Sequence, residues 1–346
     1  MIPVNIVTGF LGSGKTTLLR EILQRPDFSD TAVIVNEFGE IGLDHILLEE
    51  VEEGVLLLES GCICCTIRSD LQETIRGLQE KAAKGVIAPF RRIVIETTGL
   101  ADPAPIVSTI AAEPVIRNHF RNANIICTLD AVNGLATLAQ QPEATKQLAV
   151  ADRILITKTD MADEAAVDAL ETRVDAINAI AVRGRSTGAD FEAQLLFAED
   201  IGDAGWRSTE IVRWLQDDAT KSHESAHDHH HSHGHTASVH SFTVSYPRPI
   251  DWTAFGVWLT ALLHAHGERI LRVKGILNVR ESETPVVIQG VQHVVHPPMH
   301  LGAWPDDGRD SRIVFIVRDI DETAIRRSLI AFLEMAARLT DEALAV

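Results

Sequence analysis

Short apolar runs rich in β-branched residues alternate with helical patterns over the first half of the chain. The predicted strands cover residues 2–8, 32–36, 55–58, 92–96, 124–129 and 153–157. Apolar positions at helical spacing predict helices at residues 15–23 and 71–84, and a third helix that starts at Pro103 behind Asp102 as its cap. This alternation is typical of an α/β fold, with a doubly wound, mostly parallel sheet and helices on both of its faces.

The pattern changes at residue 217. Residues 217–240 are polar, rich in histidine and almost without aliphatic side chains, so they cannot pack a core. Strand patterns return near residues 241–246, 269–279, 286–289 and 312–317, with helix patterns at 251–264 and after Asp321. We therefore predict an α/β domain over residues 1–216, a His-rich flexible linker over 217–240 and a small α+β domain over 241–346.

Composition and net charge limit the classes of protein to which the chain could belong. The chain has 346 residues, of which 45% are hydrophobic and 23% charged, which is typical of a folded globular protein large enough for two domains. Asp and Glu outnumber Lys and Arg by 49 to 31, and the net charge of −18 argues against nucleic acid as a partner. No apolar run is long enough to cross a membrane and no basic leader occurs, so we expect a cytoplasmic protein with no membrane partner.

The strongest motif follows the first predicted strand. Residues 9–16 match the pattern G-x-x-x-x-G-K-[ST] and lead directly into the first predicted helix, which predicts a P-loop nucleotide-binding domain. In such a loop, backbone N–H groups surround phosphate oxygens, Lys15 reaches the outer phosphates and the Thr16 hydroxyl can ligate Mg²⁺. The residues expected to contact the nucleotide phosphates are Gly9, Gly12, Ser13, Gly14, Lys15, Thr16 and Thr17.

Two later motifs lie at the ends of predicted strands, where ligands of open parallel sheets bind. In residues 96–99, Glu96 would support the Mg²⁺ shell and the Gly99 N–H would meet the γ-phosphate. In residues 157–160, which begin with Thr157, Asp160 can accept two hydrogen bonds from a guanine edge while the Lys158 stem covers the ring. Together they predict a site for GTP and GDP.

Three of the four cysteines, Cys62, Cys64 and Cys65, lie within four positions. Adjacent cysteines cannot easily pair with each other in a reducing compartment, so metal binding or redox chemistry fits them better than a disulfide. Thiolates suit Zn²⁺, Cu⁺ or softer Co²⁺ sites, and a tetrahedral ion would need at least one more ligand. Glu37 and Asp44 are candidates, because their segment also follows a predicted strand.

Four segments, residues 10–17, 61–65, 96–99 and 271–275, resemble the motifs of the CobW-type metal-binding GTPases, relatives of the urease and hydrogenase accessory GTPases. The resemblance implies GTP hydrolysis coupled to handling of a transition metal, commonly zinc or cobalt, and a C-terminal domain that meets a client protein. It points to Glu37 with Cys64 and Cys65 as metal ligands. It also implies a loop near residues 185–188 that touches the base. One departure is Thr157, where many relatives have Asn.

The remaining histidines and cysteine have simpler interpretations. Cys127 lies in an apolar run and is assigned to packing, and His119 to the surface. Neutral imidazoles bind metal, so the His-rich segment is interpreted as a flexible collector of metal ions, the alternative being a solvated linker without function. Its candidate low-affinity ligands are His227, His229, His230, His231, His233 and His235.

The main functional hypothesis is a metallochaperone switch. GTP and Mg²⁺ would order the segment that carries Glu37 together with residues 62–65, and hydrolysis would release the metal to a client metalloprotein. Slow intrinsic turnover is expected, because no residue is an assured arginine finger. The alternatives are a P-loop kinase or ATPase acting on a small molecule with structural cysteines, and a metal store that uses the His-rich segment. A homo-oligomer stays open.

Overall fold

The computed structural model describes residues 1–35, 56–59, 67–187, 191, 193–197, 239–280, 282–304 and 308–344. The chain divides into two compact units, Met1–Glu199 and Asp200–Val346. The predicted His-rich linker lies outside the described residues, apart from Val239 and His240 at its end.

Seven parallel strands form the sheet of the first unit, in the order β3-β2-β4-β1-β5-β6-β7. They are β1 (Ile2–Thr8), β2 (Thr31–Val35), β3 (Leu56–Glu59), β4 (Arg92–Glu96), β5 (Phe120–Asp130), β6 (Arg153–Thr157) and β7 (Val182–Arg185). The six predicted strands are present, but β5 begins at Phe120 rather than at residue 124, because its pairing with β1 already starts opposite Ile2. The sequence pattern does not predict β7, which has a single apolar side chain.

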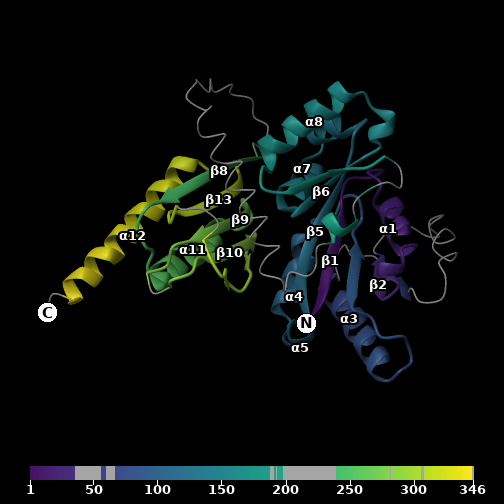
Figure 1. Ribbon diagram of the computed structural model, residues 1–346, viewed down its shortest axis with the longest axis horizontal. Helices are drawn as coiled ribbons and strands as arrows, with labels where there is room; N and C mark the ends of the chain where they lie inside the picture. The colour runs from purple at the N-terminus through teal and green to yellow at the C-terminus, as the bar shows by residue number, and fades with distance from the viewer. Residues whose placement is uncertain are drawn as a thin grey trace. The chain divides into compact units, whose positions relative to one another are not determined.

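Helices connect these strands and lie on both sides of the sheet, with α1 and α4 on opposite sides (Figure 1). They are α1 (Lys15–Leu23), α3 (Ile67–Ala83), α4 (Ala104–Ala112), α5 (Pro114–His119), α6 (Gly134–Gln140), α7 (Pro142–Val150), α8 (Glu164–Ile177) and α9 (Ala193–Leu196). Two short 3₁₀ turns are η1 (Pro26–Phe28) and η2 (Thr159–Met161). The helix predicted from Pro103 begins one residue later, and the Asp102 carboxylate accepts a hydrogen bond from the Ala104 N–H at 3.0 Å.

Burial on both faces makes the sheet a rigid support. Residues Pro3 to Thr8 of β1 are all buried, as expected for a parallel strand between two helical layers. On one face, Leu18, Leu19 and Ile22 of α1 belong to the same core cluster as the strand residue Val7. Full burial of each such side chain contributes roughly 1.5–3 kcal/mol. Loops that leave this sheet therefore start from fixed positions.

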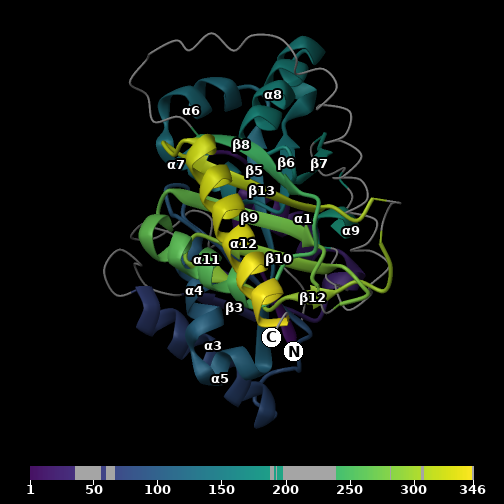
Figure 2. The same ribbon diagram turned by 90° about the vertical axis from the view of Figure 1, so that its left-hand side faces the viewer.

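The second unit is an antiparallel sheet covered by two helices, consistent with the α+β prediction. Its strands are β8 (Val239–Tyr246), β9 (Ile270–Leu277), β10 (Val286–Val291), β11 (Val294–Val295), β12 (Met299–His300) and β13 (Ser311–Arg318), in the order β11-β10-β9-β13-β8 with β12 paired to β10. Helices α11 (Trp252–His266) and α12 (Glu322–Leu344) lie on the same face of this sheet (Figure 2). Their core includes Phe255 and Leu329, packed with Phe315 of the sheet.

Local chemistry explains where α11 begins. The Asp251 side chain accepts a hydrogen bond from the Ala254 N–H at 2.8 Å, which satisfies one of the free donors of the first turn.

Across the described parts of both units, no helix combines the length and the apolar character needed to span a membrane.

Candidate nucleotide-binding site

Four loops meet at one edge of the first unit because of the strand order. Strands β4, β1, β5 and β6 are consecutive neighbours and run parallel, so their carboxyl ends lie side by side. At or directly after these ends lie the phosphate loop (residues 9–16), residues 96–99, Asp130 and the base loop (residues 157–160). The topology therefore brings the predicted nucleotide-binding residues to a single edge, the position where open parallel sheets bind ligands.

Glycines allow the phosphate loop to approach β5 closely. Gly9 has φ 141°, and a Cβ atom there would lie 2.4 Å from Thr128 Oγ1 and 2.6 Å from Ser13 Oγ. Gly14 has φ 96° and forms the N-cap of α1 in the left-handed conformation. The Ser13 hydroxyl is hydrogen-bonded to the Thr128 hydroxyl at 2.7 Å, so this predicted phosphate contact fastens the loop to β5.

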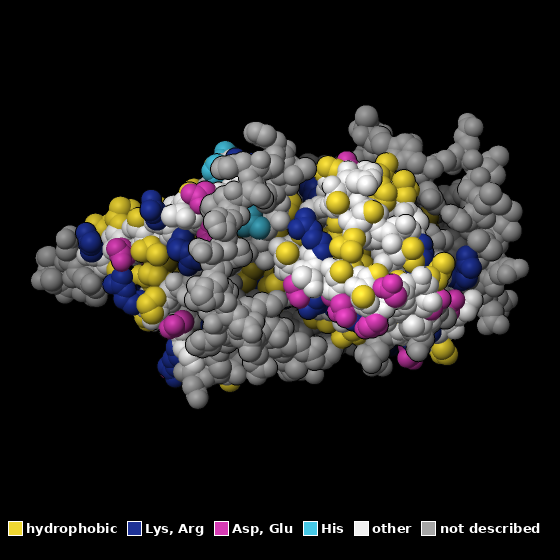
Figure 3. Space-filling view, turned by 90° about the horizontal axis from the view of Figure 1, so that it is seen from above, with side chains coloured by type: hydrophobic (Ala, Val, Ile, Leu, Met, Phe, Trp, Pro, Cys, Tyr) yellow, Lys and Arg dark blue, Asp and Glu magenta, His cyan; other side chains and the backbone are white. Residues whose placement is uncertain are grey.

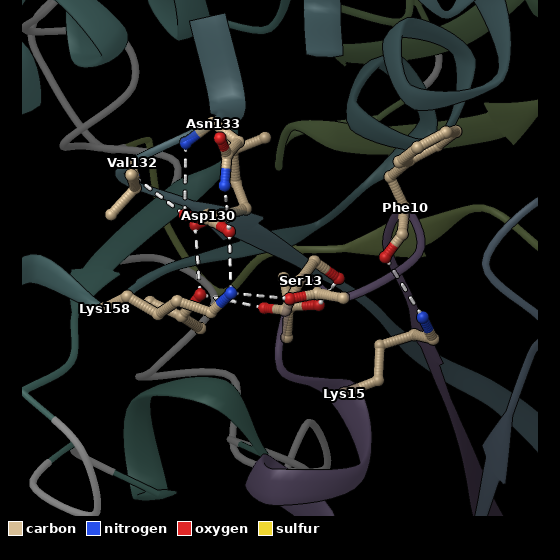
Figure 4. Close-up of polar contacts among 11 residues, drawn as sticks. Phe10, Ser13, Lys15, Asp130, Val132, Asn133 and Lys158 are labelled. Atoms are coloured by element: carbon tan, nitrogen blue, oxygen red, sulfur yellow. Dashed lines mark hydrogen bonds and ion pairs between the residues drawn. The ribbon is translucent and has the colours of Figure 1, made fainter. Parts of the chain in front are cut away.

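The Lys15 ammonium group lies inside the curve of the phosphate loop. Its Nζ donates to the Phe10 carbonyl at 3.2 Å (Figure 4) and to the Gly9 carbonyl at 3.0 Å. The side chain is largely buried. The Lys15 charge and the positive end of the α1 dipole lie on the same side of the loop. Together they favour the binding of an anion there. Thr17, the last residue predicted for this loop, is exposed on α1.

Thr16 and Glu96 bring two hard oxygen ligands together. The Thr16 hydroxyl donates to Glu96 Oε1 at 2.8 Å, and Glu96 at the end of β4 is only 4% exposed. The next residue is also fixed, since the Thr97 hydroxyl donates to Thr8 Oγ1 at 3.0 Å. A hydroxyl and a carboxylate at this separation fit the ligand preference of Mg²⁺. Gly99 is buried, and a Cβ atom there would lie 2.6 Å from Leu11 N of the phosphate loop.

The base loop is tied to the phosphate loop at two points. The Thr157 hydroxyl donates to the Ser13 carbonyl at 2.8 Å and to the Leu129 carbonyl at 3.3 Å. Lys158, with φ 58°, donates from Nζ to the Gly12 carbonyl at 2.9 Å. Asp160 is exposed on η2, where its carboxylate is accessible to a base.

Asp130 completes this site, and the sequence analysis missed it. Its Oδ2 accepts from Lys158 Nζ at 2.7 Å, and its Oδ1 accepts from the Val132 N–H at 2.7 Å and the Asn133 N–H at 3.2 Å (Figure 4). Burial by itself would raise the pKa of Asp130, but the hydrogen bond from Lys158 and those from Asn133 and Val132 outweigh it and hold the pKa below its ordinary value. The available signal was its position directly after the predicted strand of residues 124–129.

A loop after β7 also reaches the base loop. The Ser186 carbonyl accepts from the Thr159 hydroxyl at 2.8 Å and from the Thr159 N–H at 3.3 Å. The preceding Arg185 forms ion pairs with Glu164 and Glu171 of α8. Separately, Figure 3 shows Asp and Glu side chains gathered in a row on one face of the protein. The two hydrogen bonds between Thr159 and Ser186 hold the described part of the predicted loop, residues 185–187, against residues 157–160.

The proposed transition-metal ligands are not placed by the structure. Outside the described residues lie Glu37, Asp44, Cys62, Cys64, Cys65, His227, His229, His230, His231, His233 and His235. Among the residues that the structure does describe, no group of three or more His, Cys, Asp or Glu side chains could hold a metal ion. Cys127 is 2% exposed, and burial raises the pKa of its thiol to about 12, which agrees with its predicted packing role.

Comparison with known proteins covers both units. Residues 3–182 match the family model described as CobW/HypB/UreG, nucleotide-binding domain, and residues 239–333 match the cobalamin synthesis protein cobW C-terminal domain. The chain is 34% identical over 325 residues to the zinc chaperone YjiA of Escherichia coli, covering 94% of this chain and 96% of that protein. It is 28% identical over 360 residues to the zinc chaperone CobW of Sinorhizobium sp, covering 95% and 97%.

A solved structure has the same overall fold. The crystal structure of Zn(II)-bound YjiA GTPase from E. coli matches with a TM-score of 0.71 at 28% sequence identity, over 96% of this chain and 98% of that one. A likeness of this extent includes both the parallel sheet that carries the phosphate loop and the antiparallel sheet of the second unit.

Proposed function

The chain belongs to the CobW/HypB/UreG family of P-loop GTPases, and on that premise we propose that it is a GTP-dependent metallochaperone whose bound nucleotide controls its affinity for zinc. Its reaction is the hydrolysis of GTP by water, which gives GDP and phosphate. The single observation that carries the proposal is the meeting of Lys15, the Thr16–Glu96 pair and the base loop at one sheet edge.

Each of these groups has a task in nucleotide binding. Lys15 would exchange its two backbone acceptors for oxygens of the outer phosphates, and the Gly99 N–H would donate a hydrogen bond to a γ-phosphate oxygen. Thr16 and Glu96 would hold Mg²⁺, which when bound neutralises charge on the β- and γ-phosphates. Asp160 would accept hydrogen bonds from the guanine edge, while Lys158 stays fixed by Gly12 and Asp130.

The strand order supports a link between nucleotide and metal. Glu37 follows the end of β2 by two positions, and residues 62–65 fall in the connection between β3 and α3. Strands β2 and β3 are neighbours, and β2 also pairs with β4, whose last residue is Glu96. Both segments therefore leave the sheet at the edge where the γ-phosphate would lie. Switch segments beside a γ-phosphate can change order on hydrolysis.

Zinc fits the chemistry of the proposed ligands. The thiolates of Cys64 and Cys65 with the carboxylate of Glu37 suit a tetrahedral Zn²⁺ site, with Cys62 as a further candidate; cobalt would use the same ligands. Several curated relatives are named as zinc chaperones, and one from Schizosaccharomyces pombe as a zinc-regulated GTPase metalloprotein activator. We propose that the metal is delivered to a client metalloprotein through the second unit, in the cytoplasm. A nucleic-acid partner is not expected, because the net charge is −18.

A competition titration of Zn²⁺ and Co²⁺ tests the proposal. The wild type and a Cys64→Ser, Cys65→Ser double variant are each titrated with Mg²⁺ and either GDP or a non-hydrolysable GTP analogue. We expect tight binding that needs both the GTP analogue and the cysteines. Thermodynamic linkage requires that bound zinc raise the affinity for the GTP analogue by the same factor by which the analogue raises the affinity for zinc.

Two results would contradict the proposal. Equal zinc affinity with GDP and with the GTP analogue would exclude control by the nucleotide. Binding that survives the double substitution and disappears when residues 217–238 are deleted would assign the metal to the His-rich segment, and would favour the metal store.

A further inference from the structure

Gln147 of α7 is a fully buried polar side chain that holds a turn beside the phosphate loop. Its relative exposure is 0%, and Nε2 donates to the Gly99 carbonyl at 3.1 Å and to the Ala101 carbonyl at 3.0 Å. Among the described residues, Gln147 Oε1 has no hydrogen-bond partner. The only polar interactions of this amide with the described chain are therefore its two donations.

The segment that Gln147 holds is the Gly99 turn, residues 98–101. It is closed by a hydrogen bond from the Ala101 N–H to the Thr98 carbonyl at 3.1 Å. On its other side, the turn touches the phosphate loop, since an added Cβ at Gly99 would lie 2.6 Å from both the Leu11 N and the Leu11 side chain. The Gly99 turn is thus fixed between the phosphate loop and α7.

A second contact from α7 supports the same segment. Lys146 pairs with Asp102 at 2.6 Å, and Asp102 also accepts from the Ala104 N–H at the start of α4. Two consecutive residues of α7 therefore hold both the turn and the residue that follows it.

The C-terminal end of α7 is itself anchored. Asn178 is fully buried, and its Nδ2 donates to the Leu148 carbonyl at 2.8 Å and the Ala151 carbonyl at 3.0 Å. Its Oδ1 accepts from the Ala181 N–H at 3.2 Å. A helix held in this way cannot follow a displaced Gly99 turn without breaking buried hydrogen bonds, so Gln147 resists movement of that turn.

We propose that Gln147 is a positioning residue for γ-phosphate recognition, which it supports by holding the Gly99 turn, and with it the Gly99 N–H, against the phosphate loop. This inference rests on the proposed GTPase function. GDP lacks the group that meets the Gly99 N–H, so Gln147 selectively favours the GTP state. If Gln147 acted only in folding, its replacement would lower the affinities for GDP and for the GTP analogue equally.

The test is Gln147→Met, which keeps the length of the side chain and removes its amide, that is, the donating Nε2 together with the unpartnered Oε1. Affinities for GDP and for a non-hydrolysable GTP analogue, and the single-turnover hydrolysis rate, are measured on the full chain with Mg²⁺. We expect the GTP-analogue affinity and the hydrolysis rate to fall roughly 10-fold, with GDP affinity unchanged. Thr145→Val is the matched control, because it removes one α7 hydrogen bond, to the Leu138 carbonyl, that does not reach the turn.

The outcomes separate the two proposals. A Gln147→Met protein with the wild-type ratio of GTP-analogue to GDP affinity would overturn the role of Gln147, and so would an equal fall for both nucleotides. Wild-type protein without GTP hydrolysis would instead overturn the proposed function. If Gln147→Met does not fold, Lys146→Met decides: a fall in the same ratio supports the inference, and an unchanged ratio overturns it.

Discussion

The Thr16 hydroxyl donates a 2.8 Å hydrogen bond to Glu96, although 80 residues separate the two in the chain. Thr16 lies in the first turn of α1, and Glu96 ends β4, the parallel neighbour of β1. Adjacent parallel strands place their ends at the same edge, so two residues from separate motifs form one oxygen pair. This pair is the structural basis for assigning Mg²⁺ and phosphate chemistry to the site.

Replacement of Lys15 tests the phosphate site. Lys15→Ala removes the buried ammonium group beside Gly9 and Phe10, and we expect GTP hydrolysis to fall by roughly 100-fold or more. Lys84→Ala is the control, because Lys84 is exposed and pairs only weakly with Glu80 one helical turn away. Hydrolysis is measured by phosphate release. A Lys15→Ala protein with wild-type activity would remove Lys15 from the mechanism.

Replacement of Asp160 tests base recognition. Asp160→Asn exchanges two acceptors for a mixed donor and acceptor, so the preference should shift from GTP towards XTP. Nearby Asp163→Asn is the matched control: Asp163 caps α8 by accepting from the Ala166 N–H at 2.7 Å, and Asn is an equally good cap. The measurement is the ratio of kcat/KM for GTP and XTP. An unchanged guanine preference in Asp160→Asn would show that the loop does not read the base.

The fall of thermal stability at acid pH tests the ion pair between Asp130 and Lys158. Because its pKa in the folded protein lies below the ordinary 3.8, Asp130 stabilises the fold above that value, and this contribution is lost as the pH falls through the lowered pKa. Asp130→Asn removes the titrating group. We expect the wild-type Tm to fall more steeply than the variant Tm between about pH 5 and pH 3. Parallel Tm profiles would contradict the ion pair with Lys158.

Replacement of Cys127 tests which thiols bind zinc. The Cys127 thiol is buried and has a pKa of about 12, so it stays protonated and does not serve as a ligand. Cys127→Ala should leave the affinity and stoichiometry for zinc unchanged, while the free energy of unfolding falls by roughly 1 kcal/mol. Zinc titration and denaturant unfolding give both values. Lower zinc affinity in Cys127→Ala would contradict the exclusion of Cys127 from the zinc ligands.

Local patterns predicted much of the first unit. The predicted bounds of β1, β4, β6 and α1 agree with the structure, because each combines a continuous apolar run or a helical period with clear turn residues at its ends. Strand β7 was not predicted, because its sequence has almost no apolar pattern. It forms at the sheet edge through its pairing with β6. Asp130 was missed for a similar reason, since its partner Lys158 is 28 residues away in sequence.

The sequence by itself determined the phosphate loop and, through its motifs, the family, because a motif of eight residues between a strand and a helix depends on local spacing alone. Only the tertiary structure decided which distant groups meet: Thr16 with Glu96, Lys158 with Asp130, and Gln147 with Gly99. The physical reason is the order of parallel strands. That order is set by the packing of helices on both faces of the sheet, which no short stretch of sequence encodes.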